Sequence, residues 1–270
     1  MKQTRKFQDL TIGDNYMFGS VMMENDNCRQ LLERVLEMPI SRVEVIKEKS
    51  MIYHPKCKGV RLDVYAKDEN NTHYDVEMQL LKRDALPKRS RYYQGVMDVE
   101  SLNRGGSYKD LPKCFVIFVC SFDPFGKRHM KYTFTNQCEE VSNLALDDGT
   151  TKIFLNTKGK IYNVSRELQD TLRYLEEPII RENSLQLARM VDVQYRKAMS
   201  DQKWRQDVKA MEIRYQELLQ EGRAEGRDDR EIEIVLGMIE EGASDEMILK
   251  YLKISKERLE QIKKNQKVHV

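Results

Sequence analysis

Two stretches of the chain, RLDVYAK (61–67) and HYDVEMQLL (73–81), decide the fold. In both, apolar and polar residues alternate with the period of two that is typical of a β-strand with one buried face. The segment between them, DENNT (68–72), is rich in Asp and Asn, which favour a tight turn. The sequence therefore predicts a β-hairpin.

The polar face of this hairpin carries two carboxylates. Asp63 and Glu77 are equidistant from Asn70, so a symmetric register places them opposite each other with Cβ atoms about 5 Å apart. Opposed carboxylates repel, and a hard divalent cation such as Mg²⁺ would neutralise them while keeping sites for water and phosphate oxygens. Gln79 follows Glu77 by two positions and returns to the same face. The pattern predicts a divalent-metal site; the alternative is a solvated polar strand face.

The rest of the first 178 residues supplies helices and strands around the hairpin. CFVIFVCSF (114–122) is a continuous apolar run, which indicates a central strand buried on both faces. The other expected elements are helices over 14–37, a strand over 41–54, a helix over 88–104 after Pro87, one or two strands in 151–164, and a helix capped by Ser165. This order predicts an α/β fold with a mixed sheet flanked by helices.

Composition narrows the class of protein. A 270-residue chain that is 33% charged and 40% hydrophobic allows one substantial domain and a smaller appendage. Its net charge of +2 excludes a purely electrostatic binder of nucleic acid. We expect neither a signal peptide nor a membrane span, because no apolar run of sufficient length occurs. Five scattered cysteines and four unclustered histidines predict a reducing cytoplasm and a metal held by oxygen.

The chain changes character after Pro178. Residues 179–270 are predicted to be a charged helical extension, and residues 231–264 to form three short helices that end in a helix-turn-helix-like segment. This segment could contact DNA, mediate self-association or simply form a small bundle. Because EIEIVLGMIEEGAS is acidic, homo-oligomerisation through these helices is favoured over a strong grip on phosphates.

Several segments, taken in order, resemble one known family. They are LTIGDNYMFGSVM (10–22), GVRLDVYAKD (59–68), VEMQ (76–79), KRSRYYQG (88–95) and CSFDPFG (120–126). Together they resemble the Rpn family of recombination-promoting nucleases, also described as transposases, within the PD-(D/E)xK superfamily. The resemblance implies a restriction-endonuclease-like domain over residues 1–178 and a bacterial, cytoplasmic, Mg²⁺-dependent DNA endonuclease linked to recombination or transposition, with Mn²⁺ able to substitute.

The resemblance also assigns roles to residues. Asp63, Glu77 and Gln79 would be catalytic, with Asp63 and Glu77 as metal ligands, although Gln79 stands where the superfamily usually has Lys. An amide orients water by hydrogen bonds but brings no charge. Asp14 or Glu24, from the opening helices, is a further candidate ligand; the alternatives are a helix cap for Asp14 and solvent exposure for Glu24.

A basic segment follows the second strand of the hairpin. KRDALPKRSRYYQ (82–94) carries five basic residues against one Asp, and from it Arg89, Arg91 and Tyr93 are candidate contacts to DNA phosphates. The alternative is an ordinary basic helix start. Arg61 shares the face of Asp63 and would be either its ion-pair partner or a phosphate contact. The competing function is a catalytically weak or inactive nuclease-fold protein that acts as a DNA-binding or oligomeric scaffold.

Overall fold

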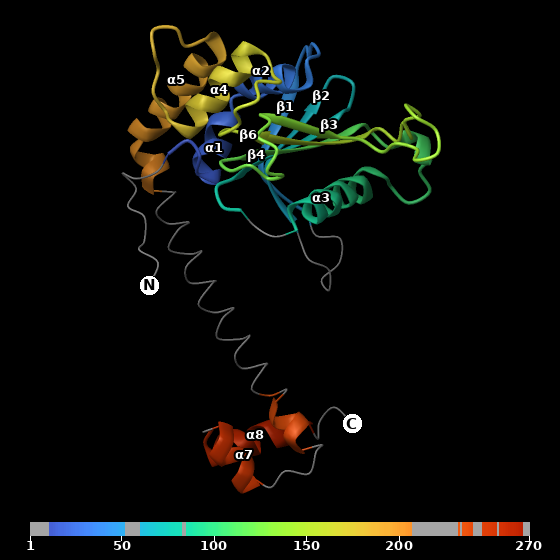
Figure 1. Ribbon diagram of the computed structural model, residues 1–270. Helices are drawn as coiled ribbons and strands as arrows, with labels where there is room; N and C mark the ends of the chain where they lie inside the picture. Colours follow the sequence, from blue (N-terminus) through green and yellow to red (C-terminus); the bar gives the residue numbers. More distant parts are fainter. Residues whose placement is uncertain are drawn as a thin grey trace. The chain divides into compact units, whose positions relative to one another are not determined.

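The chain divides into two compact units, the first ending at Arg205 and the second beginning at Gln206. A computed structural model describes residues 11–51, 60–82, 85–206, 232, 234–239, 245–252 and 254–266 (Figure 1). In this described part of the chain, no helix has the length and apolar character needed to cross a membrane.

The first unit is built on a six-stranded sheet with the order β1-β2-β3-β4-β6-β5. The strands are β1 (Val43–Met51), β2 (Val60–Asp68), β3 (His73–Gln79), β4 (Cys114–Cys120), β5 (Lys131–Phe134) and β6 (Thr150–Asn156). β1, β2 and β3 are antiparallel neighbours, β3, β4 and β6 are parallel, and β5 pairs antiparallel with β6. The sheet is therefore mixed, as predicted, and β4 is the central strand expected from its apolar run.

The hairpin and its register are confirmed. β2 and β3 pair with Val64 opposite Val76 and Lys67 opposite His73, which is the symmetric arrangement about Asn70. The short edge strand β5 was not predicted. Its four residues, KYTF, alternate polar and apolar side chains but are only half-buried or exposed, and a run of four residues is too short to distinguish a strand by its period alone.

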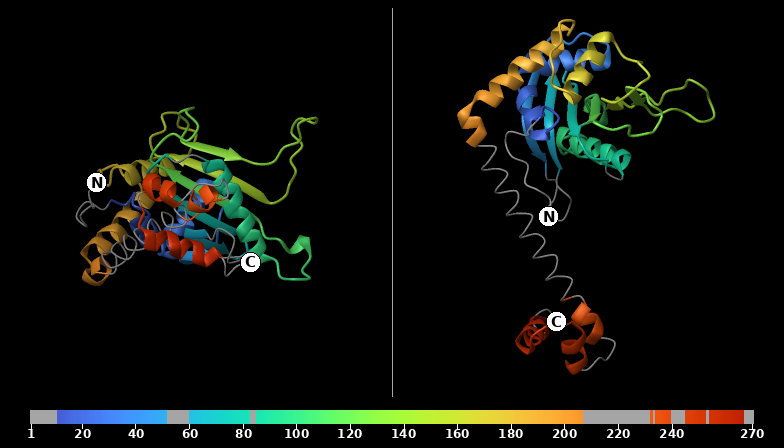
Figure 2. Two further views of the ribbon diagram at one scale, coloured as in Figure 1. Left: turned by 90° about the horizontal axis from the view of Figure 1, so that it is seen from below. Right: turned by 60° about the vertical axis from the view of Figure 1, so that its left-hand side comes forward.

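Helices cover both faces of the sheet (Figures 1 and 2). One face carries α1 (Asn15–Met22), α2 (Asn25–Leu36), α4 (Arg166–Glu176) and α5 (Gln186–Ser200). The other face carries α3 (Leu86–Ser101), and a short 3-10 turn, η2 (Tyr108–Asp110), follows it. This arrangement is the predicted α/β class.

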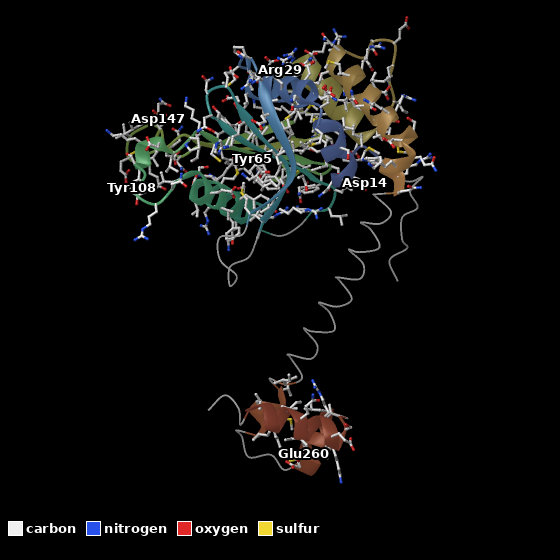
Figure 3. All side chains as sticks on the ribbon, turned by 180° about the vertical axis from the view of Figure 1, so that it is seen from behind. Asp14, Arg29, Tyr65, Tyr108, Asp147 and Glu260 are labelled. Atoms are coloured by element: carbon white, nitrogen blue, oxygen red, sulfur yellow. The ribbon has the colours of Figure 1, made fainter. Side chains whose placement is uncertain are left out.

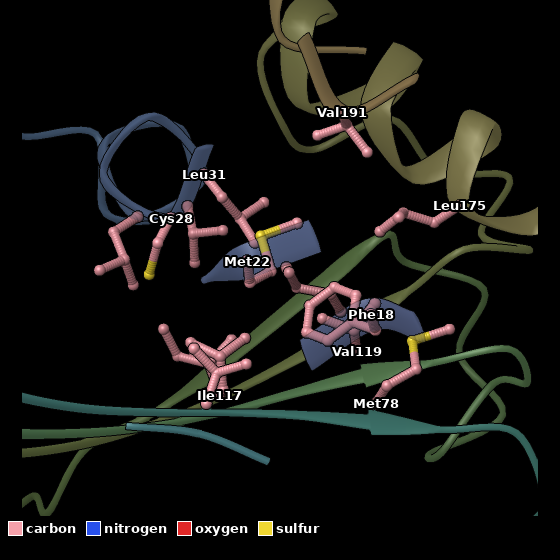
Figure 4. Packing of buried hydrophobic residues seen from close by; sticks show 14 of the residues in the cluster. Phe18, Met22, Cys28, Leu31, Met78, Ile117, Val119, Leu175 and Val191 are labelled. Atoms are coloured by element: carbon pink, nitrogen blue, oxygen red, sulfur yellow. The ribbon is translucent and has the colours of Figure 1, made fainter. Parts of the chain in front are cut away.

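Each helical layer has its own apolar cluster. Figure 4 shows the larger one, where Phe18 and Leu31 of the first two helices face Met78 and Val119 of the sheet. The smaller cluster lies beneath α3 and includes Phe118. Since burial of apolar surface is the main favourable contribution to folding, these two layers fix which sheet face each helix covers.

Helix α5 belongs to the first unit. Its Leu187, Ala188 and Val191 are fully buried in the larger cluster, and the Tyr174 hydroxyl of α4 donates to Asp192 Oδ1 of α5 at 2.9 Å. The first compact unit therefore extends to Arg205, beyond the boundary expected near residue 178, because the first helix of the charged extension packs its apolar side chains against the helices α1, α2 and α4.

Local signals in the sequence set several helix ends. The Ser165 hydroxyl accepts a hydrogen bond from Leu168 N at 3.2 Å, which confirms the predicted cap of α4. Pro87 lies in the first turn of α3, where its missing N–H costs nothing. The α3 helix runs from Leu86 to Ser101, so it ends three residues before the expected end at residue 104.

The second unit contains α7 (Asp245–Leu252), α8 (Lys256–Gln266) and a helical segment over 234–239. Val235, Ile248, Leu259 and Ile262 form its apolar centre. The Ser255 hydroxyl accepts from Arg258 N at 3.1 Å at the start of α8, so the predicted turn between the last two helices is confirmed. Residues 207–231 of the predicted helical extension, and residues 240–244 between its first two short helices, lie outside the described residues.

Candidate active site

The two predicted carboxylates meet where β2 and β3 stop pairing through their backbones. The backbone register runs to Val64 opposite Val76, and the next pair is Asp63 and Glu77. At this pair, hydrogen bonds from backbone N–H groups to side chains replace the backbone–backbone ladder. Asp63 N donates to Glu77 Oε1 at 2.8 Å, and Met78 N donates to Asp63 Oδ2 at 3.3 Å. Each carboxylate thus accepts from the backbone of the opposite strand, which fixes both groups in the fork between the strands.

Gln79 completes the predicted group. It stays in the parallel ladder with β4, opposite Cys120, and is only 5% exposed. Its Nε2 donates to Glu77 Oε2 at 3.5 Å. The structure therefore brings Asp63, Glu77 and Gln79 together on the face of the sheet that α3 covers.

A third carboxylate, Asp75, was not singled out by the sequence. It is fully buried next to Glu77, and no N–H or hydroxyl group of the described residues donates to either of its oxygens. Burial, followed by the negative charges of Glu77 and Asp63, raises the pKa of Asp75 well above its ordinary value. The strand period already placed it on the face of Glu77, but the alternation could not show that this part of the face is sealed from water.

Glu77 is also hard to ionise. Burial first, and then the charge of Asp63, raises its pKa to about 8. The hydrogen bond from Asp63 N and the charge of Arg89 act in the opposite direction and lower that pKa. A negative charge at Glu77 is therefore costly unless a cation lies beside it.

Arg89 of α3 reaches directly into this group. Its Nη1 donates to Gln79 Oε1 at 2.8 Å, and its Nη2 donates to Glu77 Oε2 at 3.1 Å. Tyr93, one turn further along α3, is buried, and its hydroxyl accepts from Arg89 Nε at 2.9 Å and Nη2 at 2.7 Å. Of the predicted phosphate contacts, Arg89 and Tyr93 thus lie inside the site, whereas Arg61 and Arg91 are exposed.

The structure does not bring Asp14 or Glu24 into this group. Asp14 precedes α1 and accepts hydrogen bonds from Thr11 N at 2.8 Å and Thr11 Oγ1 at 3.4 Å. Figure 3 labels it beside the helices of the α1–α5 layer, on the face of the sheet opposite α3. Glu24 is exposed at the start of α2 in the same layer.

The donor set is compatible with a hard divalent cation. The part of the chain described by the structure contains no group of three His, Cys, Asp or Glu side chains arranged to hold a metal ion. Mg²⁺ is nevertheless commonly held by one or two carboxylates and otherwise by water and substrate oxygens. Asp63 and Glu77 provide two, and burial followed by the charge of Asp63 raises the pKa of Glu77, a shift that a bound cation would oppose.

A mixed sheet between two helical layers, with opposed carboxylates in a strand fork, defines a restriction-endonuclease-like α/β protein. A family model described as PD-(D/E)XK nuclease family transposase matches residues 15–175. The chain belongs to this family, as its resemblance to the Rpn proteins implied. No curated protein and no solved structure matches the chain.

Proposed function

We propose that the protein hydrolyses phosphodiester bonds of DNA with the help of a divalent cation, Mg²⁺ or Mn²⁺, held by Asp63 and Glu77. The observation that carries this proposal is the opposed pair itself, in which Glu77 is buried and Asp63 is half-buried. Two carboxylates are fixed in a strand fork by backbone N–H donors, and burial raises the pKa of Glu77 to about 8. A cation bound between the two carboxylates would offset the repulsion between them and the unfavourable burial of a charged Glu77. Family membership supports the class of reaction.

The residues divide the work as follows. Asp63 and Glu77 would hold the cation, which when bound would supply charge neutralisation at the phosphate and a lowered pKa for water. Gln79 orients the attacking water through its amide. The water oxygen bonds to phosphorus, one phosphorus–ester oxygen bond breaks, and the released oxygen leaves as a hydroxyl that takes one proton. The exposed Arg61 and Arg91 are proposed contacts to flanking phosphates.

Cleavage of plasmid DNA in Mg²⁺ tests the proposal. Asp63→Ala and Glu77→Ala should each lower the rate by about 100-fold or more, as expected when a transition-state charge stabiliser is lost. Glu44→Ala is the matched control, because Glu44 is an exposed acid on the edge strand β1. Unchanged cleavage in both site variants would end the proposal.

One observation favours a second function. Both oxygens of Glu77 already accept hydrogen bonds from within the protein, Oε1 from Asp63 N and Oε2 from Arg89. A site satisfied in this way is also what an inactive, DNA-binding descendant would have. Its signature would be DNA binding that is independent of Mg²⁺ and yields no cleavage product.

The second compact unit supports a separate proposal, that the chain forms homo-oligomers through it. This unit is compact by itself, with its own apolar centre of Val235, Ile248, Leu259 and Ile262, and Ile234 beside it is 42% exposed. A separate small helical unit of this kind can associate with another copy without involving the first unit. This expectation does not depend on the chemistry of the nuclease-like unit.

A further inference from the structure

The site lacks a positive charge on the strand that carries its acids. β3 presents Asp75, Glu77 and Gln79 to the site, and none of these is a cation. Hydrolysis of a phosphodiester builds negative charge on the phosphate oxygens, and fixed positive groups aimed at that charge are among the strongest contributors to catalysis. A cation delivered from another element would therefore complete the site.

Arg89 delivers that cation from α3. Its Nη1 lies 2.8 Å from Gln79 Oε1, so the guanidinium is located at the tip of the Gln79 side chain. Its Nη2 lies 3.1 Å from Glu77 Oε2. A guanidinium remains protonated at every pH at which proteins are stable, so the charge is permanent.

The guanidinium is held rigidly. Tyr93 accepts two of its N–H groups, and the guanidinium carbon lies 5.0 Å from the centre of the Tyr93 ring and 5.6 Å from that of Phe118. Within the described residues, Gln79, Glu77 and Tyr93 accept four of the five N–H groups of the Arg89 guanidinium. The fifth, on Nη1, has no acceptor among these residues and can donate to a ligand.

The position of Arg89 is unfavourable for α3 itself. Arg89 lies in the first turn of the helix, which begins at Leu86 and has no acidic residue in that turn. The helix dipole disfavours a cation there. The Arg89 side chain is only 27% exposed. Its hydrogen bonds to Gln79 and Glu77, rather than any interaction with the helix dipole, stabilise it in this position.

We propose that Arg89 is a catalytic residue that contacts the scissile phosphate through its remaining Nη1–H and supplies the charge that Gln79 lacks. The assignment rests on the proposed phosphodiesterase function. Tyr93 is a positioning residue, because it acts through Arg89. The ligand of Arg89 is therefore the non-bridging oxygen of a DNA phosphate, next to the cation held by Asp63 and Glu77.

Charge relocation provides the experiment. Arg89→Ala removes the charge, and the double variant Gln79→Lys/Arg89→Ala returns it from β3 to the same place. Arg104→Ala, at an exposed arginine three residues after the end of α3, is the matched control. We expect plasmid cleavage to fall about 100-fold in Arg89→Ala, to change by less than threefold in Arg104→Ala, and to recover at least tenfold in the double variant.

Two further readouts separate charge from structure. Binding of duplex DNA in Ca²⁺ should weaken far less than turnover in Arg89→Ala, because the contact strengthens in the transition state. The double variant should also lose activity at alkaline pH, where the wild type does not, since a lysine can deprotonate there and a guanidinium cannot. A merely structural role for Arg89 would produce neither the rescue nor the new alkaline limb.

The outcomes are distinguishable. If the wild type cleaves DNA and a folded double variant, verified by circular dichroism and thermal melting, shows no recovery, the role of Arg89 is overturned and the proposed function stands. If Arg104→Ala loses as much activity as Arg89→Ala, the effect is general electrostatics and the inference also fails. If the wild type produces no cleavage, the proposed function is overturned, and this inference, which depends on it, is overturned as well.

Discussion

The pKa of Glu77 makes a quantitative prediction about the stability of the fold. Burial and the charge of Asp63 raise that pKa from 4.5 to about 8, so the folded protein resists ionisation of a group that ionises readily once the chain unfolds. The perturbation is Glu77→Gln, which keeps the shape of the side chain and removes its titration. Glu44→Gln, at an exposed position on β1, is the control.

The sign and size follow from proton linkage. Because the pKa is higher in the folded state, Glu77 contributes its full stability below pH 4.5, and this contribution is lost as the pH rises through 8. The interval of 3.5 pH units, at 1.36 kcal/mol per unit, corresponds to about 5 kcal/mol. About 3 kcal/mol of this should be lost between pH 4.5 and 7.

Urea unfolding at a series of pH values, with EDTA present, measures the effect. His73 acts in the opposite direction, because burial and then the charges of Lys67 and Lys49 lower its pKa from 6.5 to about 4. Its contribution is lost as the pH falls through that range, and the neighbouring Asp75 also has a raised pKa, so the wild-type curve alone mixes several groups. The difference between Glu77→Gln and wild type reports Glu77 together with its coupling to Asp75, and we expect this difference to shift toward the variant by about 3 kcal/mol from pH 4.5 to 7.

Two results would refute this reasoning. One is a difference between variant and wild type that stays constant from pH 4.5 to 8, which would mean that Glu77 titrates normally. The other is a pH-dependent difference of the same size for Glu44→Gln, which would show that the burial of Glu77 is not its cause.

Two more predictions concern the support of the site and the role of the second unit. Tyr93→Phe removes the acceptor of two Arg89 N–H groups and should lower kcat about tenfold with little change in KM, the kinetic equivalent of one hydrogen bond to a charged group. The exposed neighbour gives the control, Tyr92→Phe, and equal losses in both would contradict the positioning role. A protein ending at Arg205 keeps α5 and its buried contacts, so it should fold and, by light scattering, have a smaller oligomeric state than the full chain. An unchanged oligomeric state would contradict assembly through the second unit.

The sequence by itself determined the hairpin, its register and the central strand. Alternation with a period of two places Asp63, Glu77 and Gln79 on one face, and the symmetry of the turn about Asn70 places the first two opposite each other. The structure has this register. Such features are local, because strand period and turn chemistry depend on residues close together in the chain.

Other features were decided only by the tertiary structure. Strand alternation alone does not indicate that Asp75 is buried away from water, because its burial depends on α3 covering that part of the sheet. It likewise left Arg89 as a surface phosphate contact, whereas the packing of α3 directs its guanidinium onto Gln79 and Glu77.

The remaining differences between the sequence predictions and the structure arise from which face of the sheet each helix covers. α5 joins the first unit and Asp14 lies away from the acids, because both belong to the helical layer on the opposite face of the sheet. An amphipathic pattern shows that a helix has an apolar face, but it does not show which surface that face covers. That choice depends on contacts between segments far apart in the sequence, and here it determined which charges meet at the site.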